Sequence, residues 1–216
     1  MRFLRVLISS FLAGVMIAIG GSVYLSVDNK VAGALLFSVG LFSILIFRLH
    51  LYTGKICYLV SGEGAWYHRL SEVLITLLGN TMGAGLTGHL LSEKFMNTAA
   101  LPLVEKKLAI PLGYVFVYAA FCGILIYVAV EAFRSVKEGA LQSTIVFLCV
   151  SVFILSGFEH SIADIFYFFA ARSHNLSSYL FLLVVVLGNT VGGILFCELH
   201  RLYRRLVAEV AETANK

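Results

Sequence analysis

The sequence predicts an all-α integral membrane protein with six transmembrane helices, and three observations carry that prediction. Of the 216 residues, 60% are hydrophobic and only 13% are charged, and the mean hydropathy of +0.93 lies outside the range of ordinary soluble domains. Four apolar runs approach or exceed the roughly 20 residues that a membrane-spanning helix needs. Two further apolar runs are interrupted by polar residues, so we expect the second and fifth segments to be broken helices.

The uninterrupted segments fall at about 6–27, 70–92, 108–133 and 176–200. The first runs from Val6 to Val27 without a charged residue, and no small-residue processing site follows it. A cleaved signal peptide would have a shorter apolar core and such a site. We therefore expect the first run to be retained as a transmembrane helix.

The two interrupted runs share one layout. The run 31–47 is followed by the polar stretch 48–55 and a short apolar piece at 56–60, and the run 139–158 contains Gly157 and meets Glu159 and His160 before an apolar continuation at 165–171. A break in a membrane helix frees backbone N–H and C=O groups, which is tolerated only where protein or a water-filled path satisfies them. Each break therefore predicts a pore wall.

An internal repeat organises these segments. The sequence Leu-Gly-Asn-Thr-Met-Gly at 78–83 recurs as Leu-Gly-Asn-Thr-Val-Gly at 187–192, each time after a broken segment. Three spans followed by three more, each triplet with a broken middle span, are typical of an inverted repeat with its site at the midplane. We expect one channel domain over 1–216, with repeats at about 4–92 and 110–200. The glycines of both motifs should allow close helix contact, and the tail 201–216 should continue the sixth span as a cytoplasmic helix.

Basic residues outside the spans are distributed unevenly between the two sides of the membrane. With six spans, the larger set lies on the side of both termini, which predicts that both termini are cytoplasmic and that the protein lies in the cell membrane. For the outer lysines we expect solvated loop positions, with an electrostatic funnel as the alternative. The larger set is Arg2, Arg5, Arg69, Arg134, Lys137, Arg201, Arg204, Arg205 and Lys216, and the smaller is Lys30, Lys94, Lys106, Lys107 and Arg172.

Other functional classes find little support. The net charge of +4 comes from residues that flank apolar runs, which argues against a nucleic-acid surface, and the four cysteines lie within apolar runs without metal spacing. His160 and Asp164 are four residues apart and could share a metal on a helix, but further ligands, a nucleophile motif and a phosphate loop are missing. We expect no enzyme, no metal and no cofactor. A membrane scaffold without transport is the alternative to a transporter.

His160 is the first functional candidate. One charged side chain at a bilayer centre costs roughly 3 to more than 10 kcal/mol, so intramembrane Glu159, His160 and Asp164 are expected to face a cavity or a permeation path. Histidine has a reference pKa of about 6.5, so His160 is suited to supply a proton or a transient positive charge. The alternative is a structural histidine that caps a half-helix. The two carboxylates are expected to support the broken helix and not to bind substrate.

The residues resemble those of the formate/nitrite transporter family. The resemblance is carried by Gly-Phe-Glu-His-Ser-Ile-Ala at 157–163, Leu-Tyr-Thr-Gly at 51–54 and both Gly-Asn motifs, and it runs from about Leu7 to Leu199. It implies an aquaporin-like protomer with an inverted repeat, a homopentamer in the lipid bilayer, and one pore in each protomer. The implied substrates are small monovalent weak-acid anions, either formate and nitrite or, alternatively, hydrosulfide, acetate or lactate.

The resemblance also implies a set of pore residues. The family's pore histidine falls on His160 and its loop threonine on Thr53, and these two are expected to face each other. Hydrophobic constrictions, which exclude hydrated ions by dewetting, fall on Phe37 and Phe153 at the outer side and on Leu41, Leu51 and Tyr52 at the cytoplasmic side.

The chain departs from the family pattern at several charged positions. Arg5 takes the place of the usual lysine, and Asp164 stands where many relatives have asparagine. The first loop is more basic because it contains Arg48, His50 and Lys55. Arg5, Arg48 and Lys55 are expected to act electrostatically on the anion, although Arg48 and Lys55 could instead satisfy free carbonyls or headgroups. The side chains expected to support the two breaks are Glu159, Asp164, Asn80 and Asn189.

Overall fold

The computed structural model describes residues 1–92 and 94–214. Lys216, the end of the predicted tail, lies outside the described residues, as do the side chains of Arg2 and Lys94. Every regular element in the described ranges is a helix, which confirms the all-α prediction. In chain order the helices are α1 (Arg2–Ser26), α2 (Lys30–Ile46), α3 (Tyr52–Ile56), α4 (Trp66–Leu91), α5 (Lys94–Leu108), α6 (Leu112–Ser135), α7 (Gly139–Leu155), α8 (Ser161–Ala170) and α9 (Leu176–Ala214).

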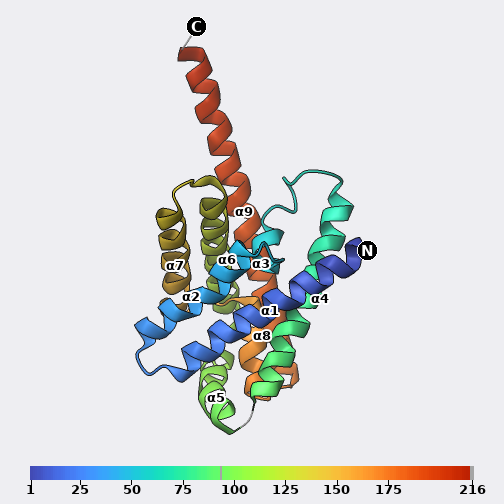
Figure 1. The fold of residues 1–216 in the computed structure, drawn as a ribbon, viewed down its shortest axis with the longest axis vertical. Helices are drawn as coiled ribbons and strands as arrows, with labels where there is room; N and C mark the ends of the chain where they lie inside the picture. The colour runs from blue at the N-terminus through green and yellow to red at the C-terminus, as the bar shows by residue number, and fades with distance from the viewer. Residues whose placement is uncertain (93, 215–216) are drawn as a thin grey trace.

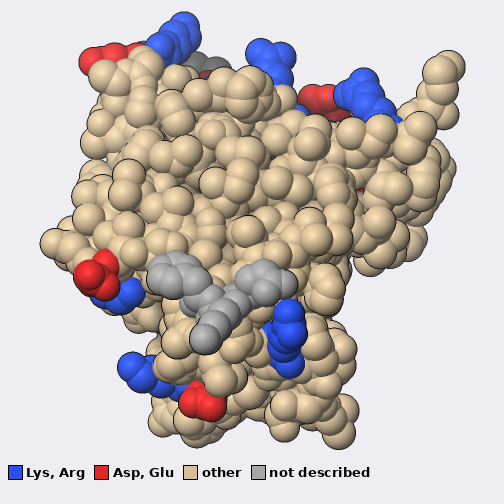
Figure 2. All heavy atoms as spheres, turned by 60° about the horizontal axis from the view of Figure 1, so that its bottom comes forward, with Lys and Arg blue, Asp and Glu red and all other residues tan. Residues whose placement is uncertain are grey.

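Within the described ranges, three helices are long and apolar enough to cross a membrane, and these are α1, α6 and α9. The predicted span 70–92 corresponds to α4, which has 26 residues but is not apolar enough to be counted with these three helices. Large hydrophobic side chains such as Leu74, Leu78, Phe121 and Leu183 are exposed on the molecular surface. The face in Figure 2 shows a broad belt without Lys, Arg, Asp or Glu, with charges gathered above and below it. An exposed apolar belt of this kind fits a protein surrounded by lipid.

Both interrupted runs are broken helices, as predicted: α2 is followed by the short α3, and α7 by α8. The second halves begin earlier than the hydropathy indicated, at Tyr52 instead of 56 and at Ser161 instead of 165. The reason is that side chains from other helices fix both starting points, because Asn80 accepts the N–H of Tyr52 and Asn189 accepts the N–H of Ser161. Hydropathy contains no information about such contacts.

The same backbone device makes both breaks. Arg48 and Gly157 have positive φ angles of 53° and 68°, and they are equivalent at an offset of 109 residues, since 48 + 109 = 157. The next amide bonds back across the last helical turn in each case, from Leu49 N to Ile44 O and from Phe158 N to Phe153 O, both at 2.9 Å. This is the Schellman ending of a helix, with the left-handed residue just past the last turn.

Close packing joins α1 to α4 and α6 to α9, and glycine makes it possible. A Cβ on Gly83 would lie 2.1 Å from the carbonyl oxygen of Phe11, and a Cβ on Gly192 would lie 2.0 Å from that of Ala120. Only glycine allows backbones to approach this closely. The close contact expected for the glycines of the two Gly-Asn motifs is therefore present in both halves.

Two helices extend beyond the predicted pattern. The segment expected to be a solvated outer loop contains α5, a helix of 15 residues with Pro102 inside it, which packs against α8. Helix α9 has 39 residues, so at about 1.5 Å per residue it is roughly twice as long as the hydrocarbon core is thick. Its C-terminal part projects from the bundle as a single helix (Figure 1), so the predicted helical tail is present as far as Ala214.

Candidate functional site: a cavity ending at His160 and Thr53

Two asparagines hold the broken helices in place. Asn189 Oδ1 accepts the amide of Ser161 at 2.9 Å, and its Nδ2 donates to the carbonyl oxygens of Ala119 and Glu159, both at 2.8 Å. The Asn189 side chain is completely buried. It therefore ties the break before α8 to α6 and satisfies backbone groups that the break would leave unpaired.

Asn80 makes the equivalent bonds in the first half of the chain. Its Oδ1 accepts the amide of Tyr52 at 2.7 Å, and its Nδ2 donates to the carbonyl oxygens of Ser10 at 2.7 Å and His50 at 2.9 Å. Every partner lies 109 residues before its counterpart around Asn189. The supporting role predicted for both asparagines thus has a specific geometry, the clamping of two helix breaks.

The structure brings the two polar pore candidates together. Thr53 Oγ1 lies 3.0 Å from His160 Nε2, and both side chains are buried. Thr53 comes from the first turn of α3, whereas His160 immediately precedes α8. The contact therefore joins the starts of the two half-helices that follow the breaks.

The hydrogen bonds of His160 assign its tautomer. His160 is the N-cap of α8, and its Nδ1 accepts the backbone N–H of Ala163 at 3.2 Å. A nitrogen that accepts a hydrogen bond carries no proton, so the neutral ring has its hydrogen on Nε2 and donates it to Thr53 Oγ1. The Thr53 hydroxyl then keeps its own hydrogen to donate. Capping and the contact with Thr53 use opposite nitrogens, so the capping role does not prevent His160 from contacting Thr53.

Two aromatic rings, Phe37 and Phe153, line the same cavity as His160. Their rings meet edge to face with centroids 6.1 Å apart, and the Phe153 ring stacks on the His160 imidazole at 5.6 Å. Phe37, Phe153 and His160 line a cavity of about 200 Å³, together with Tyr24 and Tyr167. Sequence reasoning missed the two tyrosines, because nothing in a single apolar helix pattern distinguishes a cavity-lining tyrosine from a packed one.

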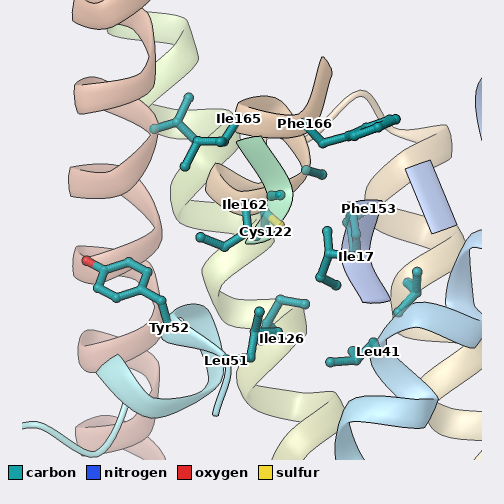
Figure 3. Packing of buried hydrophobic residues seen from close by; sticks show 14 of the residues in the cluster. Ile17, Leu41, Leu51, Tyr52, Cys122, Ile126, Phe153, Ile162, Ile165 and Phe166 are labelled. Atoms are coloured by element: carbon teal, nitrogen blue, oxygen red, sulfur yellow. The ribbon is translucent and has the colours of Figure 1, made fainter. Parts of the chain in front are cut away.

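The three residues predicted for the cytoplasmic constriction are all buried, and the Tyr52 side chain has a polar partner that the two leucines lack. Leu41, Leu51 and Tyr52 all belong to the buried hydrophobic cluster, part of which is drawn in Figure 3. The Tyr52 ring points away from both leucines toward α9, where its hydroxyl lies 2.6 Å from Thr190 Oγ1. The backbone of Tyr52 remains at the break, but its side chain contacts α9.

A buried ionic cluster lines the same cavity as His160. Lys107 at the end of α5 forms an ion pair with Glu159 Oε2, and its Nζ lies 3.0 Å from Asp164 Oδ1. The prediction that Lys107 is a solvated loop residue is therefore wrong, because its side chain is only 12% exposed. Burial acts to lower the pKa of the Lys107 ammonium, but the carboxylates of Asp164 and Glu159 outweigh it and raise that pKa above its ordinary value.

The two carboxylates expected to support the break, Glu159 and Asp164, both pair with Lys107. The sequence signal that could have found this lysine is the cost of burying two carboxylates near the start of one half-helix, which demands a cation from elsewhere in the fold. Lys106, the neighbouring lysine, is exposed as expected, but it lies in the last turn of α5 and not in a loop.

The predicted electrostatic residues lie apart from the contact between Thr53 and His160. Arg5 is exposed near the start of α1, and Arg48 is exposed at the first break, where it occupies the left-handed position. Lys55 forms an ion pair with Glu72 of α4, and both side chains are partly exposed. None of the three lines the cavity described above.

Comparison with known proteins gives a consistent result. The nitrite transporter NirC of Salmonella typhimurium strain LT2 is 27% identical over 226 residues, covering 91% of this chain and 81% of NirC. NirC of Escherichia coli strain K12 is 29% identical over 232 residues, covering 91% and 82%.

Two solved structures share the fold. A pentameric formate channel with formate bound superposes with a TM-score of 0.83 at 24% identity, over 95% of this chain and 98% of the channel. An ion channel of the FNT family gives a TM-score of 0.79 at 25% identity, over 93% and 90%. A sequence model of the family described as "Formate/nitrite transporter" matches residues 1–203. These relatives are transporters and channels and not enzymes, and the chain belongs to the formate/nitrite transporter family.

Proposed function

We propose that this protein transports small monovalent weak-acid anions of the formate and nitrite class through a pore within each protomer. The observation that carries the proposal is the 3.0 Å contact between Thr53 Oγ1 and His160 Nε2, because His160 also lines the cavity. Buried polar groups with hydrogens to donate, placed at a helix break inside an apolar bundle, are suited to an oxygen-bearing anion. The nitrite transporters and the formate channel that resemble this chain support the same substrate class.

The apolar walls explain why the substrate must be a weak acid. A fully charged anion that leaves water for an apolar passage pays a large desolvation cost, whereas its neutral acid pays far less. The Phe37 ring meets Phe153 edge to face and Phe153 stacks on His160, and apolar rings of this kind disfavour a hydrated ion by dewetting. A weak acid can cross such a constriction after it has gained a proton, and a strong-acid anion cannot.

His160 and Thr53 act as hydrogen-bond donors in this proposal. In the assigned tautomer Nε2–H donates to Thr53 Oγ1, so the Thr53 hydroxyl can turn its hydrogen toward a permeating oxygen or sulfur atom. A positive charge on the imidazole would require a proton on Nδ1, and this would displace the Ala163 amide that Nδ1 now accepts. His160 therefore assists proton or charge transfer at the cost of its capping bond.

The proposed assembly is a homopentamer in the cell membrane, with both termini in the cytoplasm. The chain is a multi-pass membrane protein, and its exposed apolar side chains can be covered by lipid or by neighbouring protomers. The formate channel that shares the fold is described as pentameric. We also propose that the whole chain acts as one channel domain with repeats at about 4–92 and 110–200, because bonds around Asn80 recur around Asn189.

Flux through proteoliposomes tests the function. Purified protein would be assayed for uptake of formate, nitrite, hydrosulfide, acetate and lactate at two pH values, with His160→Asn as the informative variant. Asparagine is also a good N-cap, but it is too short to reach Thr53, so the change keeps the cap and removes the contact. His68→Asn is the matched control, because His68 is exposed at the start of α4.

Each outcome has a distinct meaning. We expect saturable, pH-dependent uptake of at least one acid, a loss of about tenfold or more in His160→Asn, and no change in His68→Asn. Unchanged flux in His160→Asn would leave the histidine with its capping role alone. No flux of any acid through correctly folded protein would refute transport and favour a membrane scaffold.

A further inference from the structure

The cavity lined by Phe37, Phe153 and His160 is called the outer cavity below, because α5 belongs to the predicted outer loop. It contains one more buried carboxylate than it has buried cations. Lys107 is paired with both Glu159 and Asp164, whose side chains are 2% and 1% exposed. One ammonium and two carboxylates give this cluster a net charge of minus one when all three are ionised. Within the part of the chain that the structure describes, Asp164 Oδ2 is buried without a hydrogen-bond partner.

Among the described residues that line the cavity, no second buried cation pairs with Asp164. Cys122 of α6 and Tyr167 of α8 interact with it electrostatically, and Tyr24 of α1 lines the same cavity. His160 already uses Nδ1 to accept the Ala163 amide and Nε2 to contact Thr53. Lys106 lines the cavity but is exposed to solvent.

Helices α4 and α9 also pack against α8, and they meet it through uncharged groups. Gly88 of α4 lies against the backbone of Phe166, and Asn189 of α9 binds the amide of Ser161. The charge balance of the cavity is therefore set by Lys107, Glu159 and Asp164.

An anion that enters this cavity meets a cluster of its own sign. Like charges held a few ångström apart in a poorly hydrated site disfavour each other strongly, and the usual resolution is that one group takes up a proton. A proton on Asp164 Oδ2 would make the cluster neutral. It would also convert an unpartnered acceptor into a donor beside the path to His160.

We propose that Asp164 is the proton-binding residue of the outer cavity, and that one proton held on its Oδ2 accompanies each weak-acid anion that enters. This inference rests on the proposed transport function. In the step, the O–H bond of the Asp164 carboxyl group breaks, the proton forms a bond to the anion, and the neutral acid moves on past Phe37 and Phe153. The carboxylate of Asp164 then regains a proton from outside water, so one proton moves with each anion.

Infrared spectroscopy tests the proton site without any need for transport. The purified protein would be titrated from alkaline to acid pH while the C=O stretching band of protonated carboxyl groups is followed, with and without nitrite, which has no carboxyl group. Asp164→Asn keeps the shape of the side chain and removes its titration, and Asp28→Asn is the control, because Asp28 is an exposed outer carboxylate. We expect a band that nitrite strengthens in the unaltered protein and in Asp28→Asn, and that is missing in Asp164→Asn.

Flux measurements test the coupling. With equal pH on both sides and constant anion concentration, a single coupled proton gives initial uptake that rises about tenfold for each unit of falling pH while the site is unsaturated. We expect Asp164→Asn to flatten this slope to about twofold or less, and Asp164→Glu, which restores a carboxyl group, to recover it. An identical infrared band or an unchanged slope in Asp164→Asn would overturn the proposal. Absence of flux in every variant would refute transport alone, because the infrared result would still decide the proton site.

Discussion

Asn189 offers the sharpest test of how the break before α8 is held. Replacing Asn189 by alanine removes three hydrogen bonds of 2.8–2.9 Å and leaves the amide of Ser161 and the carbonyls of Ala119 and Glu159 without their partner. A buried group left unpaired costs about 1–3 kcal/mol. Because the Ala119 carbonyl keeps its bond within α6, two groups are left unpaired, and the free energy of unfolding should fall by at least about 2 kcal/mol.

Denaturant unfolding of the protein in detergent micelles, followed by helical circular dichroism, would measure this change. Asn29→Ala is a suitable control, because Asn29 is an exposed N-cap of α2 that accepts two backbone amides. Loss of such a cap costs about 1 kcal/mol. If Asn189→Ala proved no more destabilising than Asn29→Ala, the asparagine would not be the clamp of the break, and the reasoning would fail.

Asn189→Asp separates the donors of this side chain from its acceptor. Aspartate keeps an oxygen for the Ser161 amide but places a carboxylate against the carbonyl oxygens of Ala119 and Glu159, which repel it. We expect this variant to be at least as destabilised as Asn189→Ala. A variant with near-normal stability would mean that the two Nδ2 bonds contribute nothing.

Two further predictions concern packing and charge. Gly192→Ala would place a Cβ only 2.0 Å from the carbonyl oxygen of Ala120, so α6 and α9 must separate. We expect the free energy of unfolding to fall by about 2 kcal/mol or more in the same assay. Gly113→Ala is the control and should cause no loss, because its Cβ would meet nothing within 4 Å. Lys107→Met leaves two buried carboxylates without a cation and should cost about 3–5 kcal/mol at neutral pH. That penalty should shrink as the pH falls and the carboxylates gain protons, whereas Lys106→Met, at an exposed position, should change little at any pH.

Hydropathy predicted most of the fold because lipid imposes a simple rule on length and polarity. The runs 31–47 and 139–158 became α2 and α7 nearly as expected. The rule fails for α5, whose sequence is too polar and too short to be read as a span and which contains Pro102. That helix is stabilised by packing against α8, and a single sequence does not reveal such a contact.

The candidate site was predictable to a different degree at each residue. His160 stood out because an ionisable side chain within an apolar run is costly, and Thr53 followed from the resemblance of its motif. Lys107 was missed because its importance depends on an ion pair with residues more than 50 positions away. The motif around Tyr52 gave no sign that its hydroxyl would lie against Thr190 of α9, because the two residues are 138 positions apart.

The two halves of the repeat differ at the residues that form the contact between His160 and Thr53. At the offset of 109 residues, Leu51 is equivalent to His160, and both are N-caps of the half-helices, but only His160 caps with its side chain. Thr53 is equivalent in the same way to Ile162, so each half contributes one polar group to the contact, from positions that the repeat does not relate. The clamps at Asn80 and Asn189 are the same in both halves because both breaks must be stable. A scaffold would need only those shared clamps. The proposed anion path also needs hydrogen-bond donors, and His160 and Thr53 supply them at positions where the two repeats have different residues.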